Sequence, residues 1–312
     1  MDYSRATPKN NLMDLNFYKD KKIFITGATG FIGSMLTKRL TEAGADITRV
    51  DLRRPEPWAN IEKSEIIFHL AAHESGNFEP EEDLQVNALS VLYMLEACRR
   101  KQVSPKIVFA SSSNLVGAPD TIPVDESFKD NPLTIFAVHK LLAEGYLKLY
   151  FQDFDIPSII LRLANVYGPS TDTALSLHST LNKMIQNAVL GQSLKLFVNK
   201  DKIRDFLYIE DAVEAFVAAG AVSDLKGEVY IVGSEEGQSF KNIVELVAEL
   251  VLKTTKQKAD VILDEKTPIK PVEMRNFVAD SSKFKKLTDW KAETNLKSGL
   301  EKTISYFLNV KL

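Results

Sequence analysis

The fold of this chain is decided by the stretch Ile23-Phe24-Ile25-Thr26-Gly27-Ala28-Thr29-Gly30-Phe31-Ile32-Gly33. Its first four residues predict a buried strand, and the residues from Ser34 onward have helical spacing. The glycines at 27, 30 and 33 lack a Cβ, so they permit a tight turn and let the main chain approach a ligand closely. Free N–H groups at the start of the helix would then face a negative charge, such as a pyrophosphate.

An acidic residue further along the chain strengthens this interpretation. A second apolar run, residues 46–50, ends at Asp51, which lies 18 residues after Gly33, about where the ribose-binding acid of a dinucleotide site is expected. A glycine turn in an ordinary α/β protein is the alternative. Because the strand, the turn, the helix and the acid occur in the expected order, the sequence favours dinucleotide binding.

Length and composition set the class of protein. A chain of 312 residues exceeds one comfortable core, which indicates a large domain with a smaller one. With 45% apolar residues, 26% charged residues, a net charge of −3 and no block of Lys and Arg, nucleic-acid binding is not expected. The single cysteine, Cys98, excludes an internal disulfide and fits a reducing compartment. The sequence has no run of 18 apolar residues and no signal-peptide segment, so we expect a cytoplasmic protein without membrane contacts.

Strand and helix patterns alternate through the first half of the chain. We expect strands at 23–26, 46–50, 65–70, 106–110 and 158–163, and helices from residue 34, at 82–101 and at 135–154. The gap between Asp51 and residue 65 is too short for a long crossover helix. The alternation predicts an α/β fold, a Rossmann-type, doubly wound parallel sheet with a smaller, interleaved C-terminal substrate lobe.

The pattern changes twice along the chain. Residues 1–20 are polar and predict a loose N-terminal extension, and residues 21–169 form the predicted dinucleotide-binding Rossmann domain. From 170 to 312 the alternation loosens, with a helix at 175–190, a strand at 194–198, a helix at 210–220 and a strand at 229–232 that is a candidate to return to the main sheet. We expect this third part to be mainly a substrate-binding lobe.

Several motifs occur in a fixed order after the glycine turn. They are Asp51, His69-Leu70-Ala71-Ala72, Asn87, Ser111-Ser112-Ser113, Lys140, Asn165-Val166-Tyr167-Gly168-Pro169, Arg204-Asp205-Phe206, the run from Arg275 to Asp280, and Trp290. The set resembles the extended short-chain dehydrogenase/reductase family, specifically its NAD-dependent nucleotide-sugar epimerase/dehydratase group, which is UDP-glucose 4-epimerase-like. The resemblance covers roughly residues 21–310. It is specific for the family and much less so for the substrate.

The resemblance implies a nicotinamide cofactor and no metal. The residues that it assigns to the cofactor are Gly27, Gly30, Phe31, Ile32, Gly33, Asp51, Leu70, Ala71, Ala72, Asn87 and Lys140. Asp51 would bond both ribose hydroxyls of NAD and repel the 2′-phosphate of NADP. Arg53 and Arg54 could instead accept that phosphate, so NADP is the alternative to NAD.

The same resemblance implies a catalytic trio. In the family a Ser or Thr, a Tyr and a Lys four residues later perform the chemistry, and the matching positions here are Ser112, Phe136 and Lys140. The tyrosine hydroxyl moves a proton to or from a sugar hydroxyl, the lysine lowers its pKa, and the serine bonds the reacting oxygen. Phe136 has no ionisable proton, so it cannot act as an acid or a base.

Two explanations of Phe136 are open. Phenylalanine keeps the ring and deletes one oxygen, so an engineered, inactive variant that traps a complex is the favoured interpretation because the surrounding pattern is intact. The other is that the natural protein never had a tyrosine here. His139, beside Lys140, is a conceivable substitute base but is more typical of a structural histidine. His73, at the end of a strand, is a candidate to contact ligand, whereas His69 is predicted to lie in the core.

The substrate side of the site is also implied by the resemblance. It assigns Asn165, Arg204 and Arg275 to the diphosphate of a nucleotide sugar, since a guanidinium donates parallel hydrogen bonds to phosphate. Further substrate contacts are expected from His73, Ser113 and Asn114. A salt bridge of Arg204 with Asp205 or Asp211 is the alternative for that arginine. Sugar epimerases often carry an arginine near Arg275 where this chain has Lys270.

The reaction can be narrowed in the same way. Relatives that remove water carry an Asp-Glu pair after the catalytic Thr, and this chain has Ser113-Asn114 instead, which disfavours dehydration. The favoured function is a nucleotide-sugar epimerase that oxidises and reduces a ring carbon with bound NAD, impaired by Phe136. The alternatives are an NAD(P)H-dependent reductase of nucleotide 4-keto-sugars and a non-catalytic nucleotide-sugar or NAD sensor. The helices at 82–101 and 135–154 correspond to those that pair subunits in the family, so a homodimer is expected.

Overall fold

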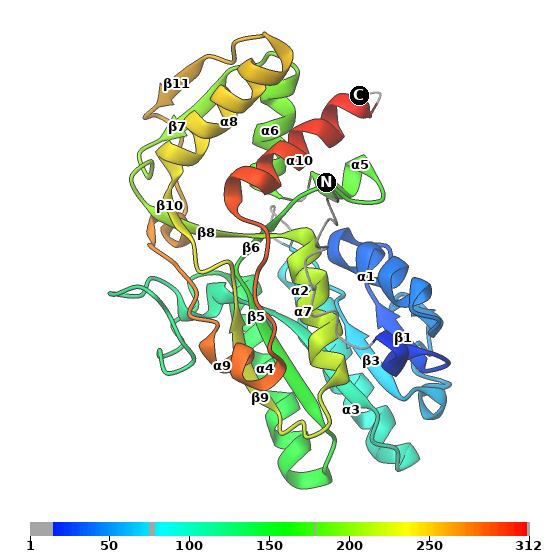
Figure 1. The fold of residues 1–312 in the computed structure, drawn as a ribbon. Coiled ribbons are helices and arrows are strands. Elements are labelled where there is room, and N and C mark those ends of the chain that lie inside the picture. Colours follow the sequence, from blue (N-terminus) through cyan, green and yellow to red (C-terminus); the bar gives the residue numbers. More distant parts are fainter. Residues whose placement is uncertain (1–14, 75–78, 178, 311–312) are drawn as a thin grey trace, which may run out of the picture.

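The centre of the computed structural model, which describes residues 15–74, 79–177 and 179–310, is a six-stranded parallel sheet (Figure 1). In spatial order its strands are β2 (Asp46–Val50), β1 (Lys22–Thr26), β3 (Ile66–His69), β4 (Lys106–Ser112), β5 (Ser158–Leu163) and β9 (Glu228–Val232). Strands β3 and β5 are buried over their full length, as expected for parallel strands covered on both faces. The predicted doubly wound α/β fold is confirmed.

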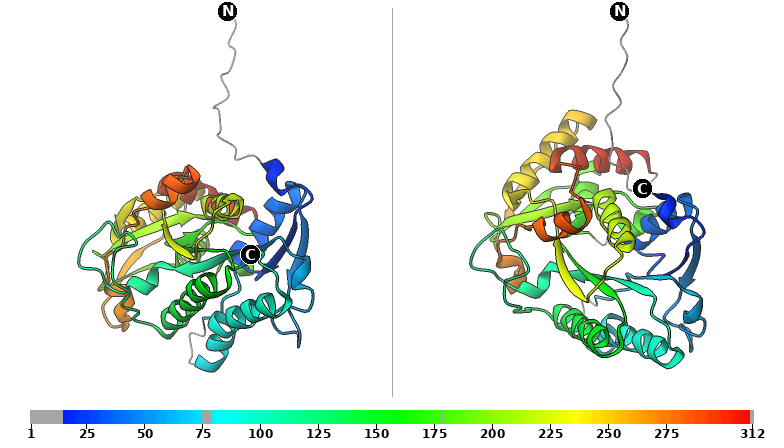
Figure 2. Two further views of the ribbon diagram at one scale, coloured as in Figure 1. Left: turned by 90° about the horizontal axis from the view of Figure 1, so that it is seen from below. Right: turned by 60° about the horizontal axis from the view of Figure 1, so that its bottom comes forward.

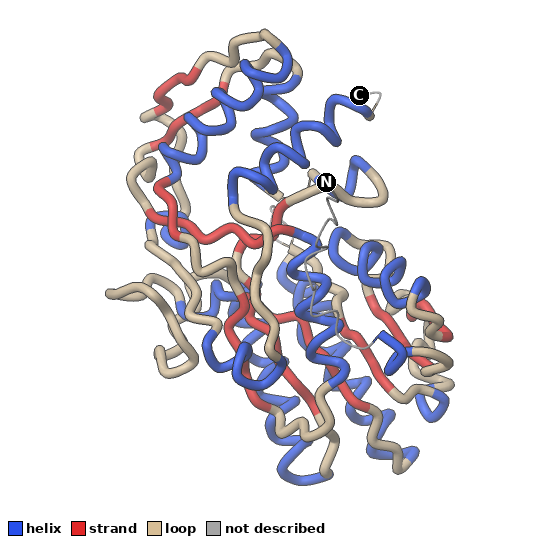
Figure 3. The backbone as a smooth tube through the Cα atoms, viewed as in Figure 1, coloured by secondary structure: helices blue, strands red, loops and turns tan. Residues whose placement is uncertain are grey.

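Helices cover both faces of this sheet (Figure 3). On one face lie α1 (Phe31–Glu42), α7 (Ile209–Ala221) and α9 (Ser282–Thr288). Leu36 and Phe216 from these helices pack in one core with Ile25 of β1. On the other face lie α3 (Ser90–Lys101) and α4 (Ile135–Phe154), which contact each other (Figure 2). Met94 and Leu147 from these two helices belong to the second core of the sheet.

The strand order changes direction at β1, which positions the site. Thr26 of β1 lies in register with Val50 of β2 on one side and with His69 of β3 on the other. Only the short 3-10 turn η2 (Ile61–Lys63) lies between β2 and β3, so no crossover helix intervenes, as predicted. Ligands of open α/β sheets bind at the carboxyl ends of strands where the order reverses. The carboxyl ends of β1 and β3 are therefore the expected binding edge.

A second lobe lies beyond these carboxyl ends (Figure 1). It contains the three-stranded sheet β10-β8-β6, with bounds Gly237–Ser239, Ile203–Tyr208 and Asn165–Tyr167, and the pair β7 (Leu194–Phe197) and β11 (Val261–Asp264). Its helices are α6 (Thr180–Val189), α8 (Phe240–Thr255) and α10 (Leu296–Asn309), which share one core. Strand β9 returns to the main sheet beside β5, as expected, so the lobe is interleaved with the sheet. The division at residue 170 stays a prediction.

Three segments differ from their expected bounds for identifiable reasons. The expected helix at 82–101 is α2 (Pro80–Leu84), a π-helical turn η3 (Gln85–Leu89) and α3, and Asn87 in the turn is buried with its amide bonded to the main chain of His73. The expected helix at 175–190 is split into α5 (Thr173–Ser176) and α6, and the amide of Asn182 in α6 donates to the Ser176 carbonyl at the end of α5. Strand β4 runs on to Ser112, since its last residues pair with β5.

The end of the predicted N-terminal extension is ordered. Residues 1–14 lie outside the described part of the chain, but the 3-10 turn η1 (Leu15–Tyr18) packs on the sheet. Tyr18 is buried, and its hydroxyl donates to the Val217 carbonyl of α7. Among the helices of the described residues, none is both long enough and apolar enough to cross a lipid bilayer.

Candidate active site

The glycine turn between β1 and α1 is shaped by close approaches that exclude side chains. Gly27 has a φ of +65°, and a Cβ there would lie 2.7 Å from the Ala71 nitrogen. A Cβ on Gly33 would lie 2.0 Å from the Gly27 carbonyl oxygen, so the start of α1 can pack on the turn only with glycine. Within the described chain no side chain caps α1, whose first turn begins after Gly30. These uncapped amides can receive an anion.

The segment after β3 lies directly beside this turn. The Leu70 N–H donates to the Thr26 carbonyl at 3.3 Å, and the Ala71 N–H donates to the Thr26 hydroxyl at 3.1 Å. Gly27 touches the same main chain. The turn and the Leu70-Ala71-Ala72 segment thus form one wall at the expected binding edge, which the sequence motifs assigned to one cofactor.

Asp51 follows β2 at the same edge and is bound by a neighbouring arginine. The Arg53 guanidinium donates to both carboxylate oxygens of Asp51, at 2.8 Å and 3.0 Å. These bonds lower the pKa of Asp51 to about 2, so the carboxylate is charged at neutral pH. Because the Arg53 side chain is 91% exposed, it can swing away when a ribose binds. Arg53, the alternative acceptor of a 2′-phosphate, is therefore already paired with the acid.

Lys140 lies at the centre of the site without a tyrosine. Its Nζ donates to the Ala110 carbonyl at 2.9 Å and lies 4.6 Å from the ring centroid of Phe109 and 5.9 Å from that of Phe136. Burial lowers the pKa of Lys140 to about 7, although Glu144 opposes this shift. Phe136 is half-buried in the first turn of α4, which Thr134 caps by accepting from the Ala137 N–H at 3.1 Å.

The three serines after β4 have different environments. Ser111 donates to Glu144 at 2.6 Å, and that carboxylate also accepts from the buried Arg162, so Ser111 belongs to a structural ion network. Ser112 is half-buried and caps the 3-10 turn η4 (Ser113–Val116) by accepting from the Asn114 N–H at 3.1 Å. Ser113 is buried against an arginine, described next. Ser112 is thus the one of the three serines that is bonded neither to Glu144 nor to Arg275, and its catalytic role stays a prediction.

Two arginines meet beside the serine turn. Arg275 is 4% exposed, and its guanidinium donates to the carbonyls of Ser113 and Gly117 and, at 3.3 Å, to the Ser113 hydroxyl. Arg204 donates to the carbonyls of Ile203, Arg275 and Glu273. Burial lowers the pKa of both, and the charge of Arg204 helps to lower that of Arg275 to about 10. Within the described residues neither arginine forms an ion pair.

The acids that could have neutralised Arg204 are used elsewhere. Buried Asp205 accepts from the N–H groups of Ser234, Glu235 and Ala279, and Asp211 accepts from those of residues 293 and 294. The salt-bridge alternative for Arg204 is therefore not what the structure contains. The amide of Asn165 donates to the Asp205 carbonyl at 3.2 Å, which places it on the strand beside Arg204.

His73, the predicted ligand contact after β3, has an acidic neighbour that the sequence analysis did not identify, Asp83. His73 Nδ1 lies 2.7 Å from Asp83 Oδ1, and the buried Asp83 belongs to α2. The resemblance assigned Asn87 to the cofactor, but in the structure its side-chain amide makes two hydrogen bonds to the main chain of His73. Asp83 gave no motif signal, although its place ten residues after a strand-end histidine could have been noted. His69 is fully buried, as expected, and bonded to Ser90.

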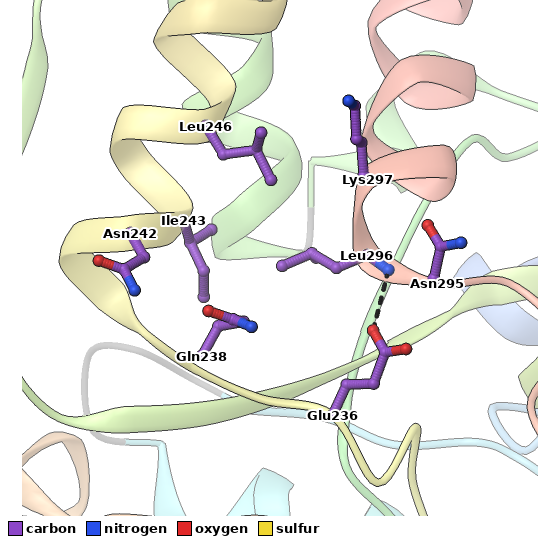
Figure 4. Close-up of a pocket in the computed structure, with 8 residues that line it drawn as sticks. All are labelled: Glu236, Gln238, Asn242, Ile243, Leu246, Asn295, Leu296 and Lys297. Carbon is purple, nitrogen blue, oxygen red and sulfur yellow. Dashed lines mark hydrogen bonds between the residues drawn. The ribbon is translucent and has the colours of Figure 1, made fainter.

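A separate cavity of about 280 Å³ lies in the second lobe, between α8 and the start of α10 (Figure 4). Ile243, Leu246 and Leu296 form its apolar wall, and Glu236 accepts from the Leu296 N–H at 3.3 Å. None of its lining residues belongs to the strand ends described above, so this cavity is not part of the candidate active site.

A glycine turn without side-chain capping at a sheet switch point, followed by a charged acid after β2, defines the dinucleotide-binding class of α/β proteins. The chain belongs to the NAD dependent epimerase/dehydratase family, whose model matches residues 23–233. The nicotinamide cofactor that this family uses agrees with the site. The predicted family is confirmed.

Individual relatives cover almost the whole chain. An uncharacterized UDP-glucose epimerase of Bacillus subtilis is 32% identical over 302 residues, which are 92% of this chain and 91% of the relative. UDP-glucose 4-epimerase of Mycolicibacterium smegmatis is 27% identical over 92% of this chain and 99% of its own. The crystal structure of UDP-glucose 4-epimerase with UDP-glucose from Thermotoga maritima superimposes with a TM-score of 0.78 at 25% identity, covering 92% and 98% of the two chains. The chain is thus an enzyme-family member related to nucleotide-sugar epimerases.

Proposed function

We propose that this chain is a nucleotide-sugar epimerase that oxidises a ring carbon of its substrate with bound NAD and then reduces it on the other face. The observation that carries the proposal is a pair of arginines, Arg204 and Arg275, neither of which forms an ion pair within the described chain. Arg275 is bonded to the turn that begins at Ser113, so a diphosphate bound to Arg204 and Arg275 would lie beside Ser112 and Lys140. The relatives named above support a nucleotide sugar as the substrate.

The cofactor proposed is NAD. The Gly27 turn leaves room only for main chain beside Ala71, and the uncapped amides of α1 suit a pyrophosphate. Asp51, ionised and at the end of the edge strand, would accept from both ribose hydroxyls and repel an added phosphate. Asp51→Asn removes the negative charge and is expected to reduce the ratio of the NADP to the NAD dissociation constant, which calorimetry with each coenzyme measures.

The chemistry divides among three residues of this chain. Bound NAD supplies the acceptor and donor of the hydride. Ser112 would hydrogen-bond the reacting oxygen, and Lys140 would bind the nicotinamide ribose. Phe136 cannot move the proton, so turnover is impaired: a general acid or base contributes about 10²–10⁴-fold. Phe136→Tyr is expected to raise kcat about a hundredfold or more.

The test begins with binding. Calorimetry with NAD and with UDP-, dTDP-, GDP- and CDP-sugars is expected to show that both cofactor and one sugar nucleotide bind, and mass spectrometry of copurified nucleotide identifies the base. Turnover is then measured for the Phe136→Tyr variant. Catalytic use of NAD supports an epimerase, whereas stoichiometric consumption of NADH or NADPH would indicate the keto-sugar reductase instead.

A sensor is the second candidate, and Phe136 is the observation that favours it. Without a phenol, Lys140 donates to the Ala110 carbonyl, an arrangement that needs no turnover. A pure binder has little use for a polarising lysine, which argues for the enzyme. Tight binding of NAD and a sugar nucleotide with no turnover in the Phe136→Tyr variant would favour the sensor and contradict the epimerase.

We also propose that the protein is a homodimer that pairs through α3 and α4. Ile135, Val138, Leu142 and Leu149 recur at helical spacing along α4, and each is between 40% and 54% exposed. On the adjacent α3, Tyr93 is 54% exposed. An apolar stripe across two neighbouring helices suits a two-fold contact in which each copy presents the same face.

A further inference from the structure

A histidine at the end of β3 is held in one orientation by three hydrogen bonds. Its ring Nδ1 lies 2.7 Å from a carboxylate oxygen of Asp83. Its N–H donates to Asn87 Oδ1 at 3.1 Å, and its carbonyl accepts from Asn87 Nδ2 at 2.5 Å. Both the ring and the main chain of His73 are therefore positioned, while its side chain is still 35% exposed. Surface histidines need no such support.

The carboxylate decides which ring nitrogen carries the proton. Asp83 is only 4% exposed and sits on α2, where its oxygen accepts from Nδ1–H. With the proton held at Nδ1, the lone pair of a neutral ring is at Nε2. A carboxylate that orients an imidazole in this way also stabilises the imidazolium when the ring takes a second proton.

We infer that His73, oriented by Asp83, is the general base and acid that moves the substrate hydroxyl proton in this chain, where Phe136 lacks the phenol. The inference rests on the proposed epimerase function and names a proton carrier for it. Asp83 is a positioning residue, because it acts through His73 and does not touch the substrate.

The fold places this pair at the same edge of the sheet as Ser112 and Lys140. His69 of β3 is in register with Phe109 of β4, so the two strands end at the same edge of the sheet. His73 lies four residues beyond His69, and Ser112 lies three residues beyond Phe109, so both follow these paired positions by about the same length of chain. The two in-register rings are 5.8 Å apart, and Lys140 lies over the ring of Phe109. Helix α2, which carries Asp83, contacts α4, which carries Phe136.

The proposed step balances. NAD, when bound, would accept the hydride that leaves as the sugar C–H bond breaks, and would return it to the other face of the carbon. His73 Nε2 would take the proton of the breaking O–H bond as the carbonyl forms, and would give that proton back to the oxygen in the return step. Neither an added oxidant nor an added reductant is required. The charged groups near the ring are the carboxylates of Asp83, Glu79 and Glu82.

A second histidine of the same region provides the matched control. His139 lies on α4 next to Lys140, but its buried Nδ1 has no hydrogen-bond partner within the described chain. Nothing there selects a tautomer, so His139 is not prepared for proton transfer. His139→Gln tests the loss of a histidine near the site without loss of the oriented pair.

The experiment is a set of variants in two backgrounds. His73→Gln, Asp83→Asn and His139→Gln are each made in the parent chain and in the Phe136→Tyr chain. In the parent, His73→Gln is expected to lower kcat about a hundredfold, and His139→Gln to leave it within a factor of two. In the Phe136→Tyr chain, whose phenol moves the proton, His73→Gln is expected to lower kcat less than about tenfold.

Two readouts separate proton transfer from a structural role. Free imidazole is expected to restore part of the turnover of His73→Gly but not of a Ser112→Ala variant. Nitrogen-15 NMR of the apo-protein is expected to show His73 protonated at Nδ1 and neutral at Nε2, and a mixture of tautomers in Asp83→Asn. Melting temperatures verify that the variants fold. If His73→Gln does not fold, Asp83→Asn still tests the proposal.

The outcomes separate the two proposals. If cofactor and sugar nucleotide bind and the Phe136→Tyr chain turns over, but His73→Gln leaves the parent kcat unchanged, the histidine proposal is overturned and the epimerase stands. If no sugar nucleotide binds, the epimerase itself fails. Loss of parent turnover on treatment with a chelator, and its return with a divalent metal, would show that His73, Glu79 and Glu82 hold a cation and would also overturn the base.

Discussion

At the residue scale, Lys140 is a lysine of the candidate site whose ammonium group is buried. Its ammonium is buried among Phe109, Phe136 and the Ala110 carbonyl, and burial lowers its pKa to about 7. Burying a cation without a close anionic partner lowers the free energy of unfolding, so we expect Lys140 to be retained for its role in the site and not for stability. The motif pointed to Lys140 as a site residue, but only the packing around it shows that its pKa lies close to neutral pH.

The pH dependence of stability tests this reading of Lys140. Between about pH 7 and pH 10 the unfolded chain holds a proton on Lys140 and the folded chain does not, so the free energy of unfolding is expected to rise with pH in that window. Each unit of pKa difference corresponds to about 1.4 kcal/mol. Lys140→Met is expected to flatten the rise. Chemical denaturation of both proteins at several pH values measures it, and equal pH slopes would contradict the shift.

At the scale of elements, the glycine turn and α4 illustrate two uses of a helix. Helix α1 is positioned so that its first turn packs on the Gly27 carbonyl, which requires glycine at 33. Helix α4 presents one face to the sheet through Ala143 and Leu147 and leaves Leu142 and Leu149 exposed. The start of α1 is therefore constrained by its close approach to the glycine turn, whereas α4 packs one face on the sheet and leaves an apolar face for the proposed dimer contact.

Gly33→Ala is expected to weaken NAD binding at least tenfold. The added Cβ would lie 2.0 Å from the Gly27 carbonyl oxygen, so α1 must move away from the turn that is proposed to bind the pyrophosphate. Gly145→Ala is the control, because nothing lies within 4 Å of a Cβ at that helical position. Calorimetry with NAD measures both, and equal affinities would show that α1 does not form part of the pyrophosphate site.

Leu142→Asp together with Leu149→Asp is expected to convert the dimer to a monomer. Two carboxylates in the apolar stripe would be buried without partners on association. Ile262→Asp is the control: Ile262 is 50% exposed on β11, away from α3 and α4, and its replacement should leave the dimer intact. Light scattering after size-exclusion chromatography gives the mass. A parent chain that is monomeric at micromolar concentration would rule out this interface.

At the scale of the whole molecule, one returning segment ties the lobe to the sheet. After β11 the chain passes through the 3-10 turn η5 (Pro271–Met274), and Arg275 then bonds to the turn after β4. Asp205 of β8 accepts from the Ser234 and Ala279 amides, so it joins the second lobe to the same returning segment. The proposed phosphate clamp is thus also the structural link between the two parts.

This double role makes the two arginines separable by experiment. Arg275→Met is expected to lower both the melting temperature and the affinity for a UDP-sugar, since it removes buried hydrogen bonds as well as a charge. Arg204→Met, at a half-buried position, should lower affinity about tenfold with a smaller effect on melting. Lys258→Met, at an exposed lysine between α8 and β11, is the control for both. Unchanged affinity in both arginine variants would contradict the clamp.

Much of the fold could be predicted from local sequence patterns. The strand–glycine–helix unit and the full helix at 135–154 follow from residue spacing, which acts within one element. The break of the helix at 82–101 could not be read, because it follows from a bond between Asn87 and a loop fourteen residues earlier. The same holds for Asp83, whose role arises only when α2 folds back onto the end of β3.

The amino-acid sequence by itself determined the dinucleotide-binding fold, its family and the missing phenol at Phe136, because these depend on backbone freedom and side-chain chemistry at single positions. The tertiary structure decided which groups are left with unused charge. It paired Asp51 with Arg53, brought Arg204 to Arg275 with no ion pair to either within the described chain, and placed Asp83 beside the ring of His73. Arg204 and Arg275 lie 71 positions apart in the chain, and Asp83 reaches His73 only because α2 folds back onto the end of β3, so residue spacing within one element does not encode these two pairings.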